Sequence, residues 1–258
     1  MTTTLGEALG ALPVWYQLLL VIVLGAIWGS FVSALCSRWP QGERVSDGRS
    51  HCDHCQTKLS AKDLIPILSF AFLKGKCRYC GHTIGVAALY IELAAAGIGL
   101  IAMLSLSGLQ AVSAAIFGCL LLPLAVLDYQ KLWLPNRLVL ILALVGVLIA
   151  PLVTPDVSCL DRVLGGIGGF LSLEVIRQAF RITRKQDGMG GGDPKLFAAI
   201  GIWLGWQALP MTLLLSCLVG FGFMLLAYAL GKNDANKLPF GSFLCVAAYI
   251  LAVVRFAF

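Results

Sequence analysis

Two aspartates of this sequence lie at the edges of long apolar segments. Asp128 ends the run LLLPLAVLD, and Asp193 directly precedes Pro194. Charged side chains at membrane depth are costly and usually functional. Two facing carboxylates can share a proton, so that one activates water while its protonated partner polarises a carbonyl group. The pair therefore favours aspartyl-protease chemistry; helix caps or salt bridges with Lys131 and Lys195 are the alternative interpretation.

Three glycines come directly before the second aspartate: Gly190, Gly191 and Gly192. Without side chains, they let the backbone approach an extended substrate closely. Pro194 disfavours helical geometry at the residue before it. We therefore expect Asp193 to be the N-cap of a helix in which Pro194 is the first residue.

Four cysteines form two CxxC pairs with 21 residues between them: Cys52, Cys55, Cys77 and Cys80. Each pair can close a tight knuckle around one ion, and two knuckles complete a tetrahedral site. Gly81 suits the turn that the second knuckle needs. A closed site of four sulfurs leaves no open position, so the prediction is structural zinc. Redox thiols and a metal-free quartet are the alternatives.

The elements around these residues are predicted to be membrane spans. The 258 residues have a mean hydropathy of +0.89, and 12% are charged, compared with about 25% in soluble proteins. Apolar runs of about 17–25 residues can cross a bilayer. We expect an all-α polytopic protein with eight spans and both termini outside, near residues 14–35, 85–106, 110–127, 137–153, 162–180, 195–209, 210–230 and 239–257.

Basic residues are concentrated in the polar breaks between these spans. The breaks at 36–84, 128–137, 177–195 and 231–237 hold 17 of the 19 Lys and Arg residues, and only Arg162 and Arg255 lie elsewhere. This bias predicts that the breaks are cytoplasmic loops. Asp128 and Asp193 lie in two of these loops, so we expect them at the same depth on the same face. The bias also argues against a nucleic-acid partner. Lys232 and Lys237 support the short span at 195–209, because omitting that span would place both outside.

The chain is expected to divide into three parts. Residues 1–35 form the first span, residues 36–84 form a cytoplasmic zinc domain with four cysteines, and residues 85–258 form a transmembrane protease core. Glu92 and Glu174 are two further acids within apolar segments. We expect packing or polar contacts for both.

Several motifs resemble the type IV prepilin peptidase family, the GxGD class of intramembrane aspartyl proteases. Gly190 to Leu196 (GGGDPKL) is similar to the family's GxGDxKL, and Asp128 with Leu134-Pro135-Asn136 is similar to its first catalytic block. Further similarities are Trp28-Gly29-Ser30-Phe31, the loop IPILSF at 65–70, Glu92 after the second knuckle, and Pro239-Phe240-Gly241. Two positions differ from the usual pattern. Residues 86–91 replace a basic-aromatic-proline stretch, and Ser242 stands where a proline is commoner.

The resemblance implies an inner-membrane aspartyl endopeptidase that faces the cytoplasm. It would remove the leader of type IV prepilins or type II secretion pseudopilins and methylate the new N-terminus with S-adenosylmethionine. Asp128 and Asp193 would be the catalytic pair, and the three glycines, Lys195 and Glu92 would support the site. Two other functions stay open. One is a proton-coupled transporter, whose site would lie nearer the midplane; the other is a non-catalytic assembly factor with a zinc docking loop.

Overall fold

A computed structural model describes residues 13–42, 51–52, 54–184, 189–231 and 238–257. The described residues form an all-α protein without a β-strand, and they divide into two compact units, Met1–Leu104 and Ser105–Phe258. Unit 1 contains α2 (Val14–Arg38), α3 (Leu68–Phe72) and α4 (Ala87–Ser105). Unit 2 contains α5 (Gly108–Lys131), α6 (Asn136–Val153), α7 (Cys159–Arg184), α8 (Asp193–Leu204), α9 (Leu209–Ala229) and α10 (Phe240–Ala257).

Each of the eight predicted spans is a helix in the structure. Among the described residues, six helical segments are long and apolar enough to cross a membrane, and these contain α2, α4, α5, α6, α9 and α10. The other two predicted spans correspond to α7 and α8. The 12 residues of α8 extend for about 18 Å. The chain is thus a multi-pass membrane protein. The predicted division at residues 35 and 84 stays a prediction, and Lys232 and Lys237 lie outside the described residues.

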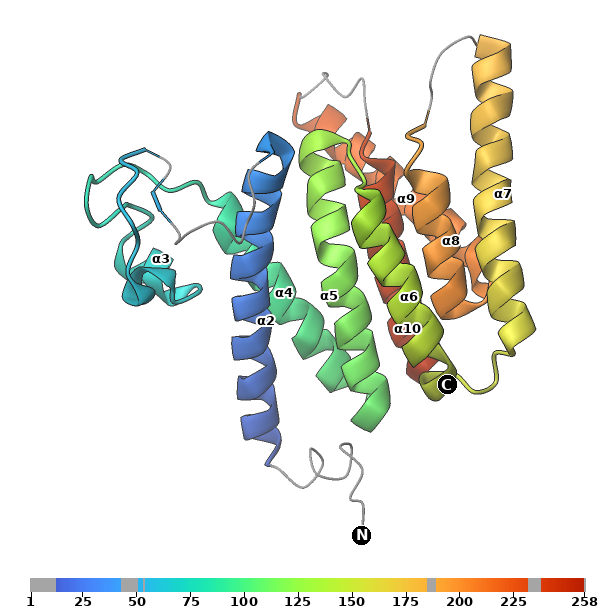
Figure 1. The fold of residues 1–258 in the computed structure, drawn as a ribbon, viewed down its shortest axis with the longest axis horizontal. Coiled ribbons are helices and arrows are strands. Elements are labelled where there is room, and N and C mark those ends of the chain that lie inside the picture. Colours follow the sequence, from blue (N-terminus) through green and yellow to red (C-terminus); the bar gives the residue numbers. More distant parts are fainter. Residues whose placement is uncertain (1–12, 43–50, 53, 185–188, 232–237, 258) are drawn as a thin grey trace. The chain divides into compact units, whose positions relative to one another are not determined.

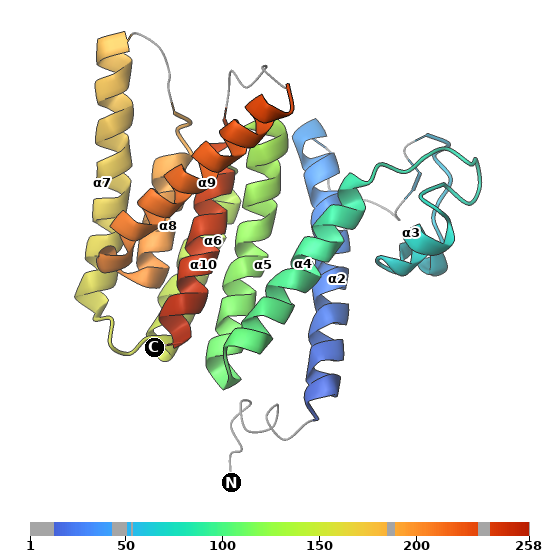
Figure 2. The same cartoon turned by 180° about the vertical axis from the view of Figure 1, so that it is seen from behind.

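Glycines bring α2 and α4 of unit 1 close together where the two helices cross (Figures 1 and 2). Gly25 and Gly29 form a GxxxG pattern in α2, and a Cβ atom added at Gly25 would lie 2.8 Å from the carbonyl oxygen of Ala95. At Gly29 the added atom would lie 2.5 Å from the Cα atom of Glu92. Small residues at such spacing let membrane helices pack backbone against backbone.

In unit 2, α5, α6, α10 and α8 lie side by side, with α7 against α8 and α9 running obliquely across α8 and α10 (Figures 1 and 2). Glycines again permit the closest approach. A Cβ atom at Gly165 of α7 or Gly201 of α8 would collide with the backbone of the other glycine. Trp203 of α8 is fully buried, and its ring nitrogen donates a 2.8 Å hydrogen bond to the carbonyl oxygen of Leu142 in α6. These contacts fix the short helix α8 inside the unit.

The buried guanidinium group of Arg162 joins the C-terminal ends of α6 and α8. Its Nη1 atom donates hydrogen bonds to the carbonyl oxygens of Ile202 and Trp203, at 3.3 and 2.9 Å. Its Nη2 atom donates to the carbonyl oxygens of Ala150 and Thr154, at 3.0 and 2.8 Å. A cation is favourable where helix carbonyl groups lack partners. Arg162 therefore holds α6, α7 and α8 together at the end opposite to Asp193.

Candidate active site and metal centre

Asp128 lies in the last turn of α5 and is 6% exposed. We expected this residue in a loop, and that expectation is wrong. The helix continues to Lys131 and ends at Leu132, which has left-handed backbone angles (φ 51°, ψ 41°). No residue between Asp128 and Lys131 breaks a helix, and Pro135 disfavours helical geometry only at the residue before it. The carboxylate is thus held on a rigid helix.

The first turn of α10 supplies the hydrogen-bond donors for Asp128. The backbone N–H of Ser242 donates to Oδ2 of Asp128 at 2.8 Å, and the Ser242 hydroxyl lies 3.2 Å from the same oxygen. The hydroxyl also lies 2.8 Å from the carbonyl oxygen of Ala125. A helix N-terminus offers unpaired N–H groups to a carboxylate.

Ser242 is a site residue that the sequence analysis missed. It was noted there only because the family more commonly has a proline at this position. A proline at this position would have neither the N–H nor the hydroxyl donor. The one signal in the sequence was its place three residues after Pro239, at the expected start of the last span.

Asp193 is the first residue of α8 and is 4% exposed. The expected N-cap is wrong by one residue, because Gly192 is the N-cap, with helical backbone angles (φ −83°, ψ −31°). Pro194 still lies within the first turn, where its missing N–H is tolerated. A Cβ atom at Gly190 would lie 3.3 Å from Oδ2 of Asp193, so this glycine keeps the space beside the carboxylate open.

Packing in unit 2 brings the two aspartates together. The carboxylates of Asp128 and Asp193 are close enough to interact electrostatically, and the buried Cys245 of α10 lies near both. Leu134 packs between the segment that precedes Asp193 and the start of α10. A Cβ atom added at Gly192 would lie 3.1 Å from the Cδ1 atom of Leu134, and one added at Gly241 would lie 2.9 Å from the same atom. The ends of α5, α8 and α10 that form this site lie at one end of the unit (Figure 1).

The remaining predicted support residues of unit 2 surround Asp193. The Lys195 ammonium group donates a 2.8 Å hydrogen bond to Oδ1 of Asn136 at the start of α6. Gly191 lies near the Arg177 guanidinium group, at 3.5 Å from an added Cβ atom. Arg177 in turn donates two hydrogen bonds to Glu174, at 2.9 and 2.7 Å, so that Glu174 makes polar contacts, one of the two kinds that we expected.

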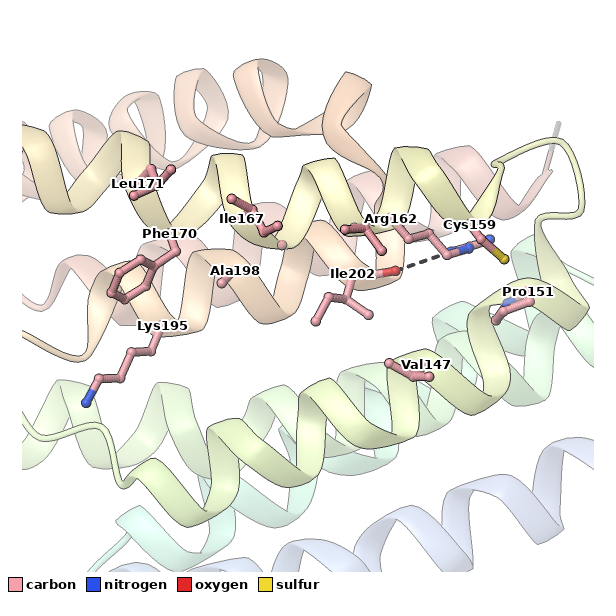
Figure 3. Close-up of a pocket in the computed structure, with 12 residues that line it drawn as sticks. Val147, Pro151, Cys159, Arg162, Ile167, Phe170, Leu171, Lys195, Ala198 and Ile202 are labelled. Atoms are coloured by element: carbon pink, nitrogen blue, oxygen red, sulfur yellow. Dashed lines mark hydrogen bonds between the residues drawn. The ribbon is translucent and has the colours of Figure 1, made fainter.

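An apolar groove of about 650 Å³ extends between α6, α7 and α8 (Figure 3). Lys195 lies at one end of the groove and Arg162 at the other, and Ala198 and Ile202 line its length on α8. Apart from Cys159, the other lining residues are apolar: Val147, Pro151, Val163, Gly166, Ile167, Phe170 and Leu171. The groove therefore begins two residues from Asp193 along α8.

The four predicted metal ligands of unit 1 form a cluster. The sulfur atoms of Cys52, Cys55, Cys77 and Cys80 all lie within 4.8 Å of one another. The sulfurs of Cys52 and Cys80 are 4.0 Å apart, close to the edge of a tetrahedron with zinc–sulfur bonds of about 2.3 Å. Hydrogen bonds with Thr57 lower the pKa of the Cys55 thiol to about 6, which favours the thiolate form that binds metal. The quartet therefore fits one tetrahedral ion.

The two knuckles have the same backbone hydrogen bonds. In the first, the N–H of Cys52 donates to the carbonyl oxygen of Thr57, and the N–H of Gln56 donates to that of Cys52. In the second, Cys77 pairs with His82 and Gly81 with Cys77 in the same way. Gln56 and Gly81 both have positive φ angles, 57° and 69°, so Gly81 makes the turn that the sequence predicted. The rings of His54 and His82 stack with centroids 4.2 Å apart.

Glu92 belongs to unit 1, where it lies in α4. Its side chain is buried, and Oε2 accepts a 2.7 Å hydrogen bond from the N–H of Ile67. Asp63, in the same unit, accepts hydrogen bonds from Ser60 and Arg78, and these lower its pKa to about 2. The structure therefore brings the predicted site residues into two groups, one in each unit.

A multi-pass helical protein that holds two buried carboxylates at one end of a bundle has the architecture of an intramembrane aspartyl protease. Two family models match the chain. The bacterial peptidase A24 N-terminal domain covers residues 23–106, and the type IV leader peptidase family covers residues 115–225. The chain belongs to the type IV leader peptidase family.

Curated relatives agree with this assignment. A prepilin leader peptidase/N-methyltransferase of Aeromonas hydrophila is 35% identical over 92% of this chain and 90% of its own length. Proteins of the same name from Burkholderia pseudomallei and Klebsiella pneumoniae are 36% and 37% identical. These two matches cover 92% and 74% of this chain, and 85% and 87% of the relatives. No solved structure matches the chain.

Proposed function

We propose that this protein is an aspartic endopeptidase that removes the leader from type IV prepilins or type II secretion pseudopilins. The observation that carries the proposal is the meeting of Asp128 and Asp193, buried at the ends of two helices far apart in the sequence. The family and the names of the relatives supply the substrate class. The same names support N-methylation of the new N-terminus with S-adenosylmethionine.

The chemistry follows from two carboxylates that share one proton. The ionised member takes a proton from water, which attacks the scissile carbonyl carbon, while the protonated member donates a hydrogen bond to the carbonyl oxygen. Ser242 holds the Asp128 carboxylate through Oδ2. Gly190 and Gly241 keep side chains away from the two acids, which leaves room for an extended substrate backbone.

The proposed location is the bacterial inner membrane, with the aspartates and the cysteine cluster facing the cytoplasm. The concentration of basic residues in the predicted cytoplasmic breaks supports this orientation. Zinc is the proposed ion of the cysteine cluster, and its role there is structural, since four thiolates leave no position for water.

The groove between α6, α7 and α8 suits the apolar helix that follows the cleaved bond of the substrate. It starts beside Asp193, its lining between Lys195 and Arg162 is mostly apolar, and Lys195, Ala198 and Ile202 lie along one face of α8. Ala198→Trp should raise KM for a membrane-embedded prepilin by about tenfold, whereas Leu218→Trp on the exposed face of α9 should not. An unchanged KM for Ala198→Trp would assign the groove to lipid.

Proteolysis is tested with purified protein in liposomes and a prepilin substrate, and cleavage is detected by mass spectrometry of the substrate. The wild type should release the leader, and Asp128→Ala and Asp193→Ala should not, while both retain their metal. Cleavage that survives in either variant would contradict the paired mechanism. Proton-coupled uptake by the same liposomes without cleavage would support a transporter, and pilin processing in cells that express only the variants would support an assembly factor.

A further inference from the structure

Unit 1 contains a cavity of about 220 Å³, lined by polar and apolar residues, that the proposed peptidase chemistry does not use. Its walls come from α2, α4 and the loop that carries the second knuckle. On α2, Ser30, Ser33, Ser37 and Arg38 all face it. The three serines recur at intervals of three and four, so they form one polar stripe on a mostly apolar helix, with Arg38 at its end. Such a stripe beside a cavity indicates a polar ligand rather than helix packing.

The cavity lining contains two acids. Asp63 is paired with Arg78 at 2.6 Å, whereas the charge of Glu92 is not balanced within the described residues. The residue is 8% exposed, and its Oε2 atom accepts one hydrogen bond, from Ile67. In the part of the chain that the structure describes, Glu92 forms no ion pair and Oε1 accepts no hydrogen bond. A buried carboxylate without a cationic partner is unfavourable. A positively charged ligand in the cavity would remove that cost.

A strained turn supports the view that Glu92 belongs to a built site. Ile67 has φ 62° and ψ −51°, a conformation that a β-branched residue rarely adopts. The hydrogen bond to Glu92 holds this turn, and the next residues place Ser69 and Phe70 on the cavity wall. Backbone strain of this kind concentrates at functional sites.

The cavity also offers a positive charge and room for a larger ligand. Two arginines line the cavity. Arg78 is paired with Asp63, whereas Arg38 is half-buried and forms no ion pair with the described residues. A second cavity of about 370 Å³ adjoins the first and shares four lining residues with it: His51, Leu59, Cys77 and Ile84. An acid, a cation and several hydroxyl groups match a ligand that carries a carboxylate, an extra positive charge and sugar hydroxyls.

We propose that this cavity binds S-adenosylmethionine, with Glu92 facing the cationic sulfonium and Arg38 facing the carboxylate of the donor. The inference rests on the proposed methyltransferase function and assigns its donor site to unit 1. In the transfer, the lone pair of the substrate's neutral α-amine attacks the methyl carbon. The S–C bond breaks, sulfur keeps the electron pair and becomes a neutral thioether, and the methylated ammonium loses a proton to water.

The test is direct binding of S-adenosylmethionine and of S-adenosylhomocysteine, which lacks the sulfonium charge, by equilibrium dialysis against the full chain in detergent. The wild type should prefer the methyl donor by about tenfold or more. Glu92→Gln should lose that preference while binding the neutral thioether as before, because the amide is uncharged. Glu174→Gln is the matched control, since Glu174 is paired with Arg177 in unit 2, and it should bind both ligands as the wild type does.

Retained preference in Glu92→Gln would overturn the assignment, as would a wild type that binds neither ligand at millimolar concentration. Ser33→Leu provides a second test if Glu92→Gln loses its metal and fails to fold. Leucine would fill the cavity from α2, so both ligands should bind at least about tenfold more weakly; unchanged binding would also overturn the proposal. Leader cleavage is measured on the same preparations and reports separately on the peptidase. If the protein cleaves the leader but does not bind the donor, the proposed donor site is refuted and the proposed peptidase function is not.

Discussion

The cysteine cluster of unit 1 and the aspartate pair of unit 2 are assembled in different ways. Each cysteine knuckle is a local structure, closed by hydrogen bonds between residues four or five apart, and the two knuckles then share an ion site. The aspartates come from α5 and α8, and Ser242 of α10 completes their site. The cluster is built from short turns and has a geometry that suits a metal ion, whereas the pair depends on the packing of a whole helical unit.

The largest effect should follow from removing metal ligands. Cys77→Ser combined with Cys80→Ser should abolish metal binding, because two thiolates cannot complete a tetrahedral structural site and such sites contribute on the order of 10 kcal/mol to folding. Metal analysis and limited proteolysis of the first unit measure the loss. Cys159→Ser combined with Cys217→Ser changes two exposed cysteines outside the cluster and should retain the metal. A full metal content in the first variant would refute the proposed zinc site.

The next largest effect should come from the arginine that joins the helix ends of unit 2. Arg162→Met leaves the carbonyl groups of α6 and α8 without their donor, so we expect a loss of about 3–5 kcal/mol in unfolding free energy. Thermal unfolding in detergent gives the shift. Arg255→Met removes a 3.9 Å, partly exposed pair with Asp156 and should cost less than about 1 kcal/mol. Equal shifts would show that Arg162 does not hold the unit together.

These two predictions also separate what the sequence could reveal from what it could not. The cysteine cluster was predictable because a CxxC knuckle needs only neighbouring residues. The eight helices were predictable from apolar runs. Asp128 and Asp193 were expected at the same depth, although their helix positions were wrong by a few residues, because hydropathy does not locate a helix end.

The supporting contacts were not predictable, since each joins residues far apart in the chain. Ser242 and Asp128 are 114 residues apart, and Arg162 and Trp203 are 41 apart. A single sequence does not show which helices pack together, so the contacts of Ser242 with Asp128 and of Arg162 with Trp203 could not be predicted. The methyl-donor cavity is a similar case, because Glu92 could be singled out in the sequence but the serines of α2 that line the same cavity could not.

The smallest effect should come from the hydroxyl donor beside Asp128. Ser242→Ala keeps the backbone N–H bond but removes the hydroxyl contact, so leader cleavage should slow by at most about tenfold. Initial rates on a prepilin in liposomes measure the change. Ser172→Ala removes a hydroxyl whose one hydrogen bond among the described residues is to the carbonyl oxygen of Gly169, and it should leave the rate unchanged. A complete loss of cleavage in Ser242→Ala would show that the hydroxyl takes part in the reaction itself.

The most direct test of the aspartate pair is a double-mutant comparison of cleavage rates. Asp128→Asn and Asp193→Asn should each lower kcat by about 10³-fold, and the double variant should be no slower than either, because two groups that act as one unit lose their function together. Asp156→Asn, which changes an exposed aspartate, should cleave normally. If either single variant keeps more than a tenth of the wild-type rate, or if the two losses multiply, the two aspartates do not act as a pair.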